Sequence, residues 1–144
     1  MRVTRLGWGV KQSFRAYVEG SGGSVATDGG AARADDGTFV FQATPDSDLT
    51  LDGGALSGTG RFAGKIAFQA HGGLLSVTLT DPWVEPAGDG WVLSIAETAT
   101  RRTAIAKLGA LEGGALSAVT TLDGMMILGD HYPPGTQLDP VSLS

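Results

Sequence analysis

The sequence predicts an all-β protein: an antiparallel β-sandwich with a short N-terminal α-helix and a short helical turn near the C-terminus. Two observations carry this prediction. Glycine supplies 23 of the 144 residues, about 16%, which is more than twice its usual share of about 7%. The glycines gather in turn signals, and the segments between them are short and often rich in β-branched and aromatic residues. Short strands separated by tight turns are typical of two packed antiparallel sheets.

Length and composition limit the classes of protein that this chain can belong to. A chain of 144 residues fits one domain, and we expect a single domain over residues 1–144. With 42% hydrophobic and 17% charged residues, the chain is globular in composition. No run approaches 18 apolar residues, so we expect no transmembrane segment. The net charge of -5 argues against a general nucleic-acid surface.

The chain contains no cysteine. This excludes disulfides, thiolate metal sites and covalent haem attachment, but it leaves the redox compartment open. The basic start at residues 1–5 is not followed by the apolar run of a secretory leader. We therefore expect a cytoplasmic location, with export or attachment to the cell surface as the alternative.

Residues 6–18 form the one stretch with a clear helical pattern. Its apolar residues recur at offsets of 0, 4, 8, 11 and 12, namely Leu6, Val10, Phe14, Tyr17 and Val18. At about 3.6 residues per turn these positions share one face. Gly20 and the glycines after it are typical of a helix end. The pattern predicts a short amphipathic helix with Tyr17 at the end of its buried face.

Strands are expected from the end of this helix to residue 120, each bounded by a turn signal. The expected strands are residues 24–27, 31–34, 38–42, 49–51, 59–71, 74–81, 83–85, 91–98, 103–108 and 115–120. The glycines at 72–73 predict a hairpin turn. Alternation in the strand after this turn predicts that Leu75, Val77 and Leu79 face inward. Residues 121–129 are expected to form the second helical turn, with Thr121 as its N-cap.

No motif of a common enzyme class is present: there is no hydrolase elbow, P-loop, H-E-x-x-H or dinucleotide fingerprint. The acidic residues at 35–36, 46 and 48 lack the spacing of a calcium-binding loop, and solvated turns explain them better. The two histidines are His71 and His131. A structural zinc site would need carboxylates beside them, and no suitable cluster is visible.

Pattern alone leaves two interpretations of Tyr17. It is either a core tyrosine with a satisfied hydroxyl or a phenolate ligand to a metal or haem iron, and spacing does not decide between them. Taken singly, His71 and His131 also fit ordinary satisfied or exposed histidines better than ligands.

Three segments in order carry a more specific pattern. The first joins Leu6 and Trp8-Gly9-Val10-Lys11 to Ser13-Phe14 and Tyr17-Val18. The second runs from Phe62 and Gly64 through His71-Gly72-Gly73, Leu75, Val77 and Leu79 to Asp81-Pro82. The third is Tyr132 with Gly135-Thr136 and Leu138-Asp139-Pro140-Val141. Together they resemble the motifs of the HtaA domain, a bacterial haem-binding module, over almost the whole chain.

The resemblance implies a set of haem-binding residues. Tyr17 corresponds to the tyrosine that ligates haem iron, and His71 to the histidine that hydrogen-bonds the ligating phenolate. Ser13 corresponds to a serine that contacts a propionate, and Tyr132 to a second tyrosine at the pocket. His131 stands where the family usually has an apolar aromatic residue that packs on the porphyrin, so it is either a wall of the pocket or a second ligand.

The resemblance also implies the function: a non-enzymatic haem-binding protein in haem uptake or trafficking, with haem as its cofactor and other haem-transport proteins as possible partners. The chemistry is coherent, because tyrosine is an axial haem ligand and a phenolate prefers ferric iron. Lys11, Arg15 and the pair Arg101-Arg102 are candidates to neutralise the propionates, and the sequence does not choose among them. The alternatives are a structural or interaction domain that has lost haem, and a haem enzyme such as a peroxidase that uses His131 as its acid–base group.

Overall fold

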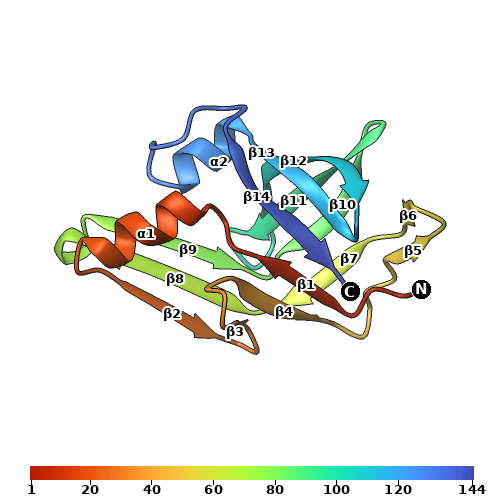
Figure 1. Ribbon diagram of the computed structural model, residues 1–144, viewed down its shortest axis with the longest axis horizontal. Coiled ribbons are helices and arrows are strands. Elements are labelled where there is room, and N and C mark those ends of the chain that lie inside the picture. Colours follow the sequence, from red (N-terminus) through yellow and green to blue (C-terminus); the bar gives the residue numbers. More distant parts are fainter.

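The computed structural model describes residues 1–144, and most of the chain is β-structure. One sheet contains strands β1 (Arg5–Trp8), β3 (Ala32–Arg33), β4 (Phe39–Ala43), β7 (Gly60–Ala63), β10 (Trp83–Ala87), β11 (Gly90–Ala96), β12 (Arg102–Glu112), β13 (Ala115–Thr120) and β14 (Gln137–Leu143). Its order is β1-β14-β13-β12-β11-β10-β7-β4-β3, and every pairing is antiparallel. Because β1 also pairs with β4, all of these strands except β3 close into a barrel (Figure 1). The all-β prediction is confirmed, but the sandwich was wrong.

Strand β1 closes the barrel, and it lies in the stretch that periodicity assigned to a helix. Leu6 pairs with Leu143 on one side and with Phe41 on the other, so both edges of β1 form ladders. Val10 adopts φ +64, and helix α1 (Gln12–Gly20) starts only after it. Gly7 favours a helix weakly, so paired strand edges on both sides outweigh the helical tendency of the segment.

Strand β14 supplies the other seam of the closure, and the sequence did not predict it. Pro140 stands inside it, and a proline normally argues against a central strand. The register shows how the sheet accommodates it: Leu116 faces Val141 while Ala118 faces Leu138, which places one extra residue on β14 between these pairs. Such a β-bulge leaves a position without ladder bonds, so the missing N–H of Pro140 breaks no pairing there.

A separate three-stranded sheet projects from the barrel below α1 (Figure 1). Its strands are β2 (Ser24–Asp28), β8 (Lys65–Ala70) and β9 (Leu75–Thr80), with β8 in the middle. The single strand expected over 59–71 is in fact β7 and β8, divided at Gly64, which has φ +141. Gly64 and Asp81 form a neck here: the Asp81 N–H donates to the Gly64 carbonyl at 2.7 Å, and the Gly64 N–H donates to Asp81 Oδ1 at 3.0 Å. The predicted hairpin after β8 is present, with the 3₁₀ turn η1 (His71–Gly73) at its tip.

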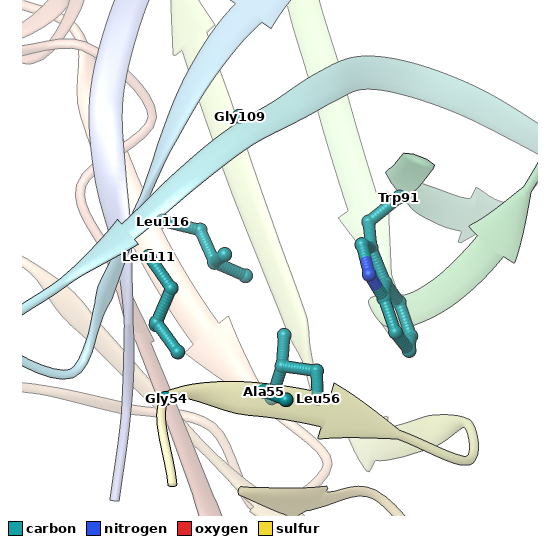
Figure 2. A pocket seen from close by; sticks show the side chains of 7 residues that line it. All are labelled: Gly54, Ala55, Leu56, Trp91, Gly109, Leu111 and Leu116. Carbon is teal, nitrogen blue, oxygen red and sulfur yellow. The ribbon is translucent and has the colours of Figure 1, made fainter. Parts of the chain in front are cut away.

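Strands β5 (Thr50–Asp52) and β6 (Ala55–Ser57) form a small hairpin against the barrel wall. Between hairpin and wall lies a pocket of about 310 Å³, lined mainly by apolar side chains (Figure 2). The lining residues are Gly54, Ala55, Leu56, Trp91, Gly109, Leu111 and Leu116. None of them is a site residue that the sequence predicts.

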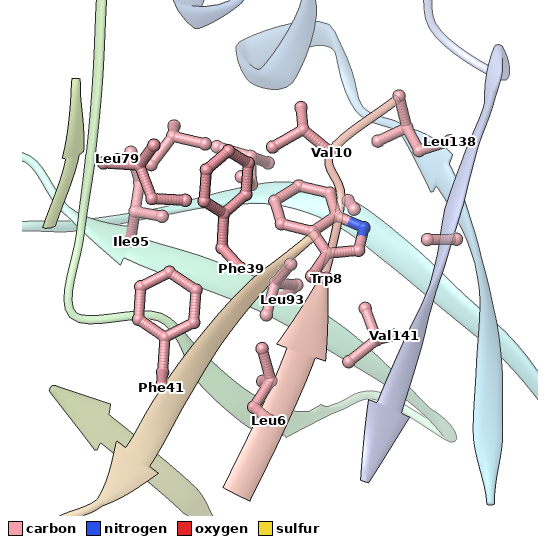
Figure 3. Packing of buried hydrophobic residues seen from close by; sticks show 14 of the residues in the cluster. Leu6, Trp8, Val10, Phe39, Phe41, Leu79, Leu93, Ile95, Leu138 and Val141 are labelled. Atoms are coloured by element: carbon pink, nitrogen blue, oxygen red, sulfur yellow. The ribbon is translucent and has the colours of Figure 1, made fainter. Parts of the chain in front are cut away.

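One cluster of buried apolar side chains runs through the barrel and into the projecting sheet (Figure 3). Helix α1 contributes Phe14 and Val18, both fully buried. The ring of Phe14 meets Phe68 of β8 edge to face at 5.0 Å between centroids, and Phe68 meets Phe39 of β4 at 5.7 Å. Helix, projecting sheet and barrel therefore share one core.

The predicted helical turn near the C-terminus is α2 (Leu122–Ile127). Its expected N-cap is confirmed, because the Gly124 N–H donates to Thr121 Oγ1 at 2.9 Å. Neither helix of the chain has the length and apolar character needed to cross a lipid bilayer.

Candidate functional site

Tyr17 lies on the last turn of α1 but not on its buried face. Its neighbours Phe14 and Val18 point into the core, while Tyr17 stands at the border of that face with 42% of its surface exposed. The prediction of a buried tyrosine was therefore wrong. Its hydroxyl oxygen lies 2.6 Å from Nε2 of His71, so the two side chains form a hydrogen bond at the surface. A phenol donates to a bare Nε2, whereas a phenolate accepts from a protonated Nε2, so this pair tolerates either state of the tyrosine.

His71 reaches Tyr17 because of the turn between β8 and β9. It is a non-glycine residue with φ +55, and Gly72 and Gly73 follow with φ +64 and +94. Three successive left-handed residues are costly unless most are glycine, so the sequence supplies two glycines here. The turn places the imidazole at the exposed tip of the projecting sheet, beside the end of α1.

His131 approaches the same tyrosine from a third segment, the loop between α2 and β14. The rings of His131 and Tyr17 lie 5.5 Å apart, close to the 5.6 Å between Tyr17 and His71. Gly129 makes this approach possible: it has φ +80, and a Cβ there would lie 2.9 Å from Leu75 Cδ1 and 3.4 Å from His131 Cδ2. The phenol of Tyr17 thus has two exposed imidazoles beside it.

Ser13 and Tyr132 form a second polar pair, one helical turn before Tyr17. Their hydroxyl oxygens are 3.2 Å apart. The Tyr132 ring packs on Phe14 at 6.0 Å between centroids, which ties the loop after α2 to the helix. The ammonium of Lys11 lies 5.8 Å from the centre of the Tyr132 ring. All five residues that the sequence predicts for the site therefore lie on or beside one side of α1.

Asp139 holds the start of α1 in place, a role that sequence reasoning missed. Its Oδ1 accepts from the Gln12 N–H at 3.1 Å, which gives the helix an N-terminal cap from another strand. Its Oδ2 pairs with Arg15 at 2.6 Å. Its main chain adds two bonds: the Asp139 N–H donates to the Val10 carbonyl at 2.9 Å, and the Asp139 carbonyl accepts from Trp8 Nε1 at 2.7 Å. The bulge in β14 leaves the main chain of Asp139 free for these contacts.

Gly9 is part of the same clamp. A Cβ on Gly9 would lie 2.3 Å from Asp139 Oδ2, and it would also collide with the guanidinium of Arg15. The close approach of the chain therefore needs glycine at this position. The signal available in the sequence was the combination of Trp8-Gly9-Val10 with Leu138-Asp139, and nothing local in either segment revealed that the two meet.

The three tryptophans are mainly packing residues, and Trp8 also donates to the clamp at Asp139. Trp8 is buried in the core, and Trp91 lines the apolar pocket beside β6. Trp83 lies under two guanidinium groups, Arg61 at 4.9 Å and Arg102 at 3.9 Å from its ring centre. Burial lowers the pKa of Arg102 from its usual value.

The donor set fits a ferric porphyrin better than a bare metal ion. No three side chains among His, Cys, Asp and Glu come close enough together to hold an ion. Instead, one phenol oxygen backed by an imidazole stands at an exposed surface, which suits a single axial bond to ferric iron. The hydroxyls of Ser13 and Tyr132 lie one helical turn before Tyr17, with the Lys11 ammonium beside Tyr132, which suits the carboxylates of a porphyrin edge. A shallow polar pocket of about 210 Å³ includes His71, and the site is otherwise an open face.

Comparison with known proteins gives a consistent result. The family model described as Htaa matches residues 4–144. The C-terminal domain of HtaA from Corynebacterium glutamicum is 29% identical, with a TM-score of 0.78 over 99% of this chain and 96% of that one. The N-terminal domain of the same protein is 22% identical, with a TM-score of 0.79 over 99% and 96% of the two chains. The heme binding protein HtaB from the same organism is 16% identical, with a TM-score of 0.70 over 98% and 91%. The last two likenesses show the fold alone, and no curated protein matches the sequence.

Proposed function

We propose, since this chain belongs to the HtaA family, that it is a haem-binding protein that serves haem uptake or trafficking rather than catalysis. The observation that carries the proposal is the 2.6 Å hydrogen bond between the exposed Tyr17 hydroxyl and His71 Nε2. The name of the relative HtaB, a heme binding protein, agrees with it.

Haem supplies a Lewis-acidic ferric iron and two carboxylates. Tyr17 is the residue that would hold the iron, as a phenolate. With Nε2 protonated, His71 would donate to the phenolate oxygen and so stabilise its negative charge and fix the ring. Ser13 and Tyr132 offer hydroxyl donors to the carboxylates, and His131 forms a wall beside the tyrosine.

The open position of this site supports capture and release. Tyr17, His71 and His131 are all exposed, so haem can reach them without any opening of the barrel. A phenolate binds ferric iron better than ferrous iron, so the bond that Tyr17 would make suits ferric haem. Other haem-transport proteins are the partners that such an exposed site would serve by direct transfer.

Titration of the purified protein with hemin tests the proposal. The wild type should give a saturable Soret band with the high-spin ferric pattern of a tyrosinate ligand. Tyr17→Phe should lose this pattern. His71→Ala should keep the pattern but bind more weakly, by the roughly 10–100-fold that loss of a ligand's hydrogen-bonding partner costs at metal sites.

The chain offers a matched control, because Tyr132 is its only other tyrosine. Tyr132→Phe should retain the tyrosinate spectrum. Identical spectra for the wild type and Tyr17→Phe would reject Tyr17 as the ligand. A wild type that gives no saturable Soret band with hemin would instead identify the protein as a structural member of the family that has lost haem.

A further inference from the structure

We propose that Lys11 supplies the positive charge that binds a carboxylate of the porphyrin, beside the hydroxyl pair of Ser13 and Tyr132. The inference rests on the proposed function. It states that this side of the site binds the edge of the porphyrin that carries free carboxylates. It also chooses among the cations that the sequence left open.

The position of Lys11 is the first argument. It precedes α1 in an extended conformation, with φ −158 and ψ 131, so its side chain leaves the helix near the loop that carries Tyr132. Its ammonium lies 5.8 Å from the Tyr132 ring centre and donates one hydrogen bond to the Gln137 carbonyl at 2.7 Å. An ammonium has three donors, so two remain for a ligand. The Gln137 bond holds the stem on the side where the hydroxyls of Ser13 and Tyr132 meet at 3.2 Å.

The second argument is that the other cations beside α1 already have anionic partners. Arg15 pairs with Asp139 at 2.6 Å, donates to the Gly9 carbonyl at 2.7 Å and keeps only 11% of its side chain exposed. Arg33 forms two hydrogen bonds to Glu19, at 2.6 and 3.2 Å. Lys11 makes no ion pair. It is therefore the cation beside α1 whose charge is available.

Arg102, of the pair that the sequence also offered, is occupied elsewhere. Its guanidinium stacks on Trp83 and donates to the carbonyls of Asp81 and Ser94. Its neighbour Arg101 lies in the turn between β11 and β12, on another part of the barrel.

The third argument concerns charge. The chain carries a net charge of -5, which repels a dicarboxylate at long range. The Lys11 ammonium, with two free donors, offsets this repulsion at the carboxylate that it contacts. The two hydroxyls beside it supply hydrogen bonds to the same carboxylate. Lysine suits an exposed edge of this kind, because its flexible stem lets a compact charge follow the carboxylate.

The test compares two ligands on the wild type and on Lys11→Met. Hemin carries free carboxylates, whereas hemin dimethyl ester has both of them capped. Lys11→Met keeps an unbranched apolar stem but removes the charged ammonium. We expect Lys11→Met to weaken hemin binding by about 5-fold at low salt, the upper range for an exposed ion pair, and to leave binding of the dimethyl ester unchanged. The hemin difference should shrink in 0.5 M salt, where the Debye length is only about 4 Å.

Two further variants keep the test specific. Lys107→Met removes an exposed lysine from β12 and should leave the affinity for hemin and for its dimethyl ester unchanged. Lys11→Arg keeps the charge and should restore hemin binding. Equal losses for hemin and its ester in Lys11→Met, or no loss for either, would overturn the role of Lys11 while Tyr17-dependent binding stands. If hemin does not bind the wild type at all, the proposed function fails, and this inference fails with it.

Discussion

The two ends of α1 are held in different ways. At its start, Asp139 caps Gln12, pairs with Arg15 and binds the main chain of Val10, so the helix is joined to β14 by a partly buried polar clamp. At its end, the side chain of Tyr17 is 42% exposed and forms its one hydrogen bond to another exposed residue, His71. The start of α1 is fixed against the barrel, and the end of α1 leaves Tyr17 accessible from solvent.

This difference suggests how a nine-residue helix can carry a binding site. A helix of this length is marginal by itself in water, so its position must come from tertiary contacts. Phe14, Val18 and Asp139 supply those contacts, and Tyr17 on the last turn is left to present its hydroxyl at the surface. Substitutions at the fixed end should therefore change the free energy of unfolding, and those at the open end should change binding.

Phe14→Ala should have the largest effect on stability. The side chain is fully buried and touches the rings of both Phe68 and Tyr132, so its loss leaves a cavity and should cost about 3–5 kcal/mol of unfolding free energy. Urea denaturation followed by tryptophan fluorescence measures this. Gln12→Ala, an exposed change on the same helix, should stay within about 0.5 kcal/mol. Equal losses for the two variants would show that the helix packs less firmly than its burial indicates.

Asp139→Ala should have the second largest effect. It removes the cap of Gln12 and leaves the nearly buried Arg15 without a carboxylate, which should cost about 2 kcal/mol. Because the helix start then loosens, hemin should also dissociate faster, with the tyrosinate spectrum preserved. Asp139→Asn can still cap Gln12 but has no charge for Arg15, so it should lie between the wild type and Asp139→Ala in unfolding experiments. If Asp139→Ala unfolds like the wild type, the clamp contributes nothing to stability.

Tyr17→Phe should have the smallest effect on stability, and it tests the difference between the two ends of α1 most directly. The hydroxyl forms one exposed hydrogen bond, so its removal should change the unfolding free energy by less than about 0.5 kcal/mol, as for most surface substitutions. The same variant should lose the tyrosinate spectrum. A loss of more than about 1 kcal/mol would mean that the hydroxyl holds α1 against the projecting sheet as firmly as the clamp does.

Much of the β-structure could be predicted from local signals. The glycine-bounded hairpin from β8 to β9, the inward side chains of β9 and the cap of α2 follow from residues close together in the sequence. Closure of the barrel could not be predicted in this way. It depends on β1 pairing with both β4 and β14, and these partners are far from it along the chain.

The error at residues 6–10 has a specific cause. Leu6 and Val10 lie four residues apart, a spacing that fits one face of a helix and also one face of a strand. Trp8 distinguishes the two: it is buried together with Leu6 and Val10, which is the alternation of a strand. Gly7 and Gly9 between them carry no side chain and so hide this alternation.

The site residues were predicted by resemblance, because local pattern left each of them ambiguous. Tyr17, His71 and His131 come from α1, the tip of the projecting sheet and the loop after α2, and only the tertiary fold brings them together. The role of Asp139 stayed hidden for the same reason: a bulge in an unpredicted strand presents it to a helix more than a hundred residues earlier in the chain.

The neck at Gly64 and Asp81 helps to set where the tip of the projecting sheet lies relative to α1. Strand β8 runs six residues from this neck to His71, about 20 Å for an extended strand, so a rotation of only about 3° at the neck displaces the imidazole by about 1 Å. A displacement of this size along the line between the two atoms would stretch the 2.6 Å hydrogen bond from Tyr17 to His71 beyond hydrogen-bond distance. If Tyr17 and His71 hold the ligand as proposed, its binding depends partly on a neck about 20 Å away, formed by two main-chain amides and one aspartate.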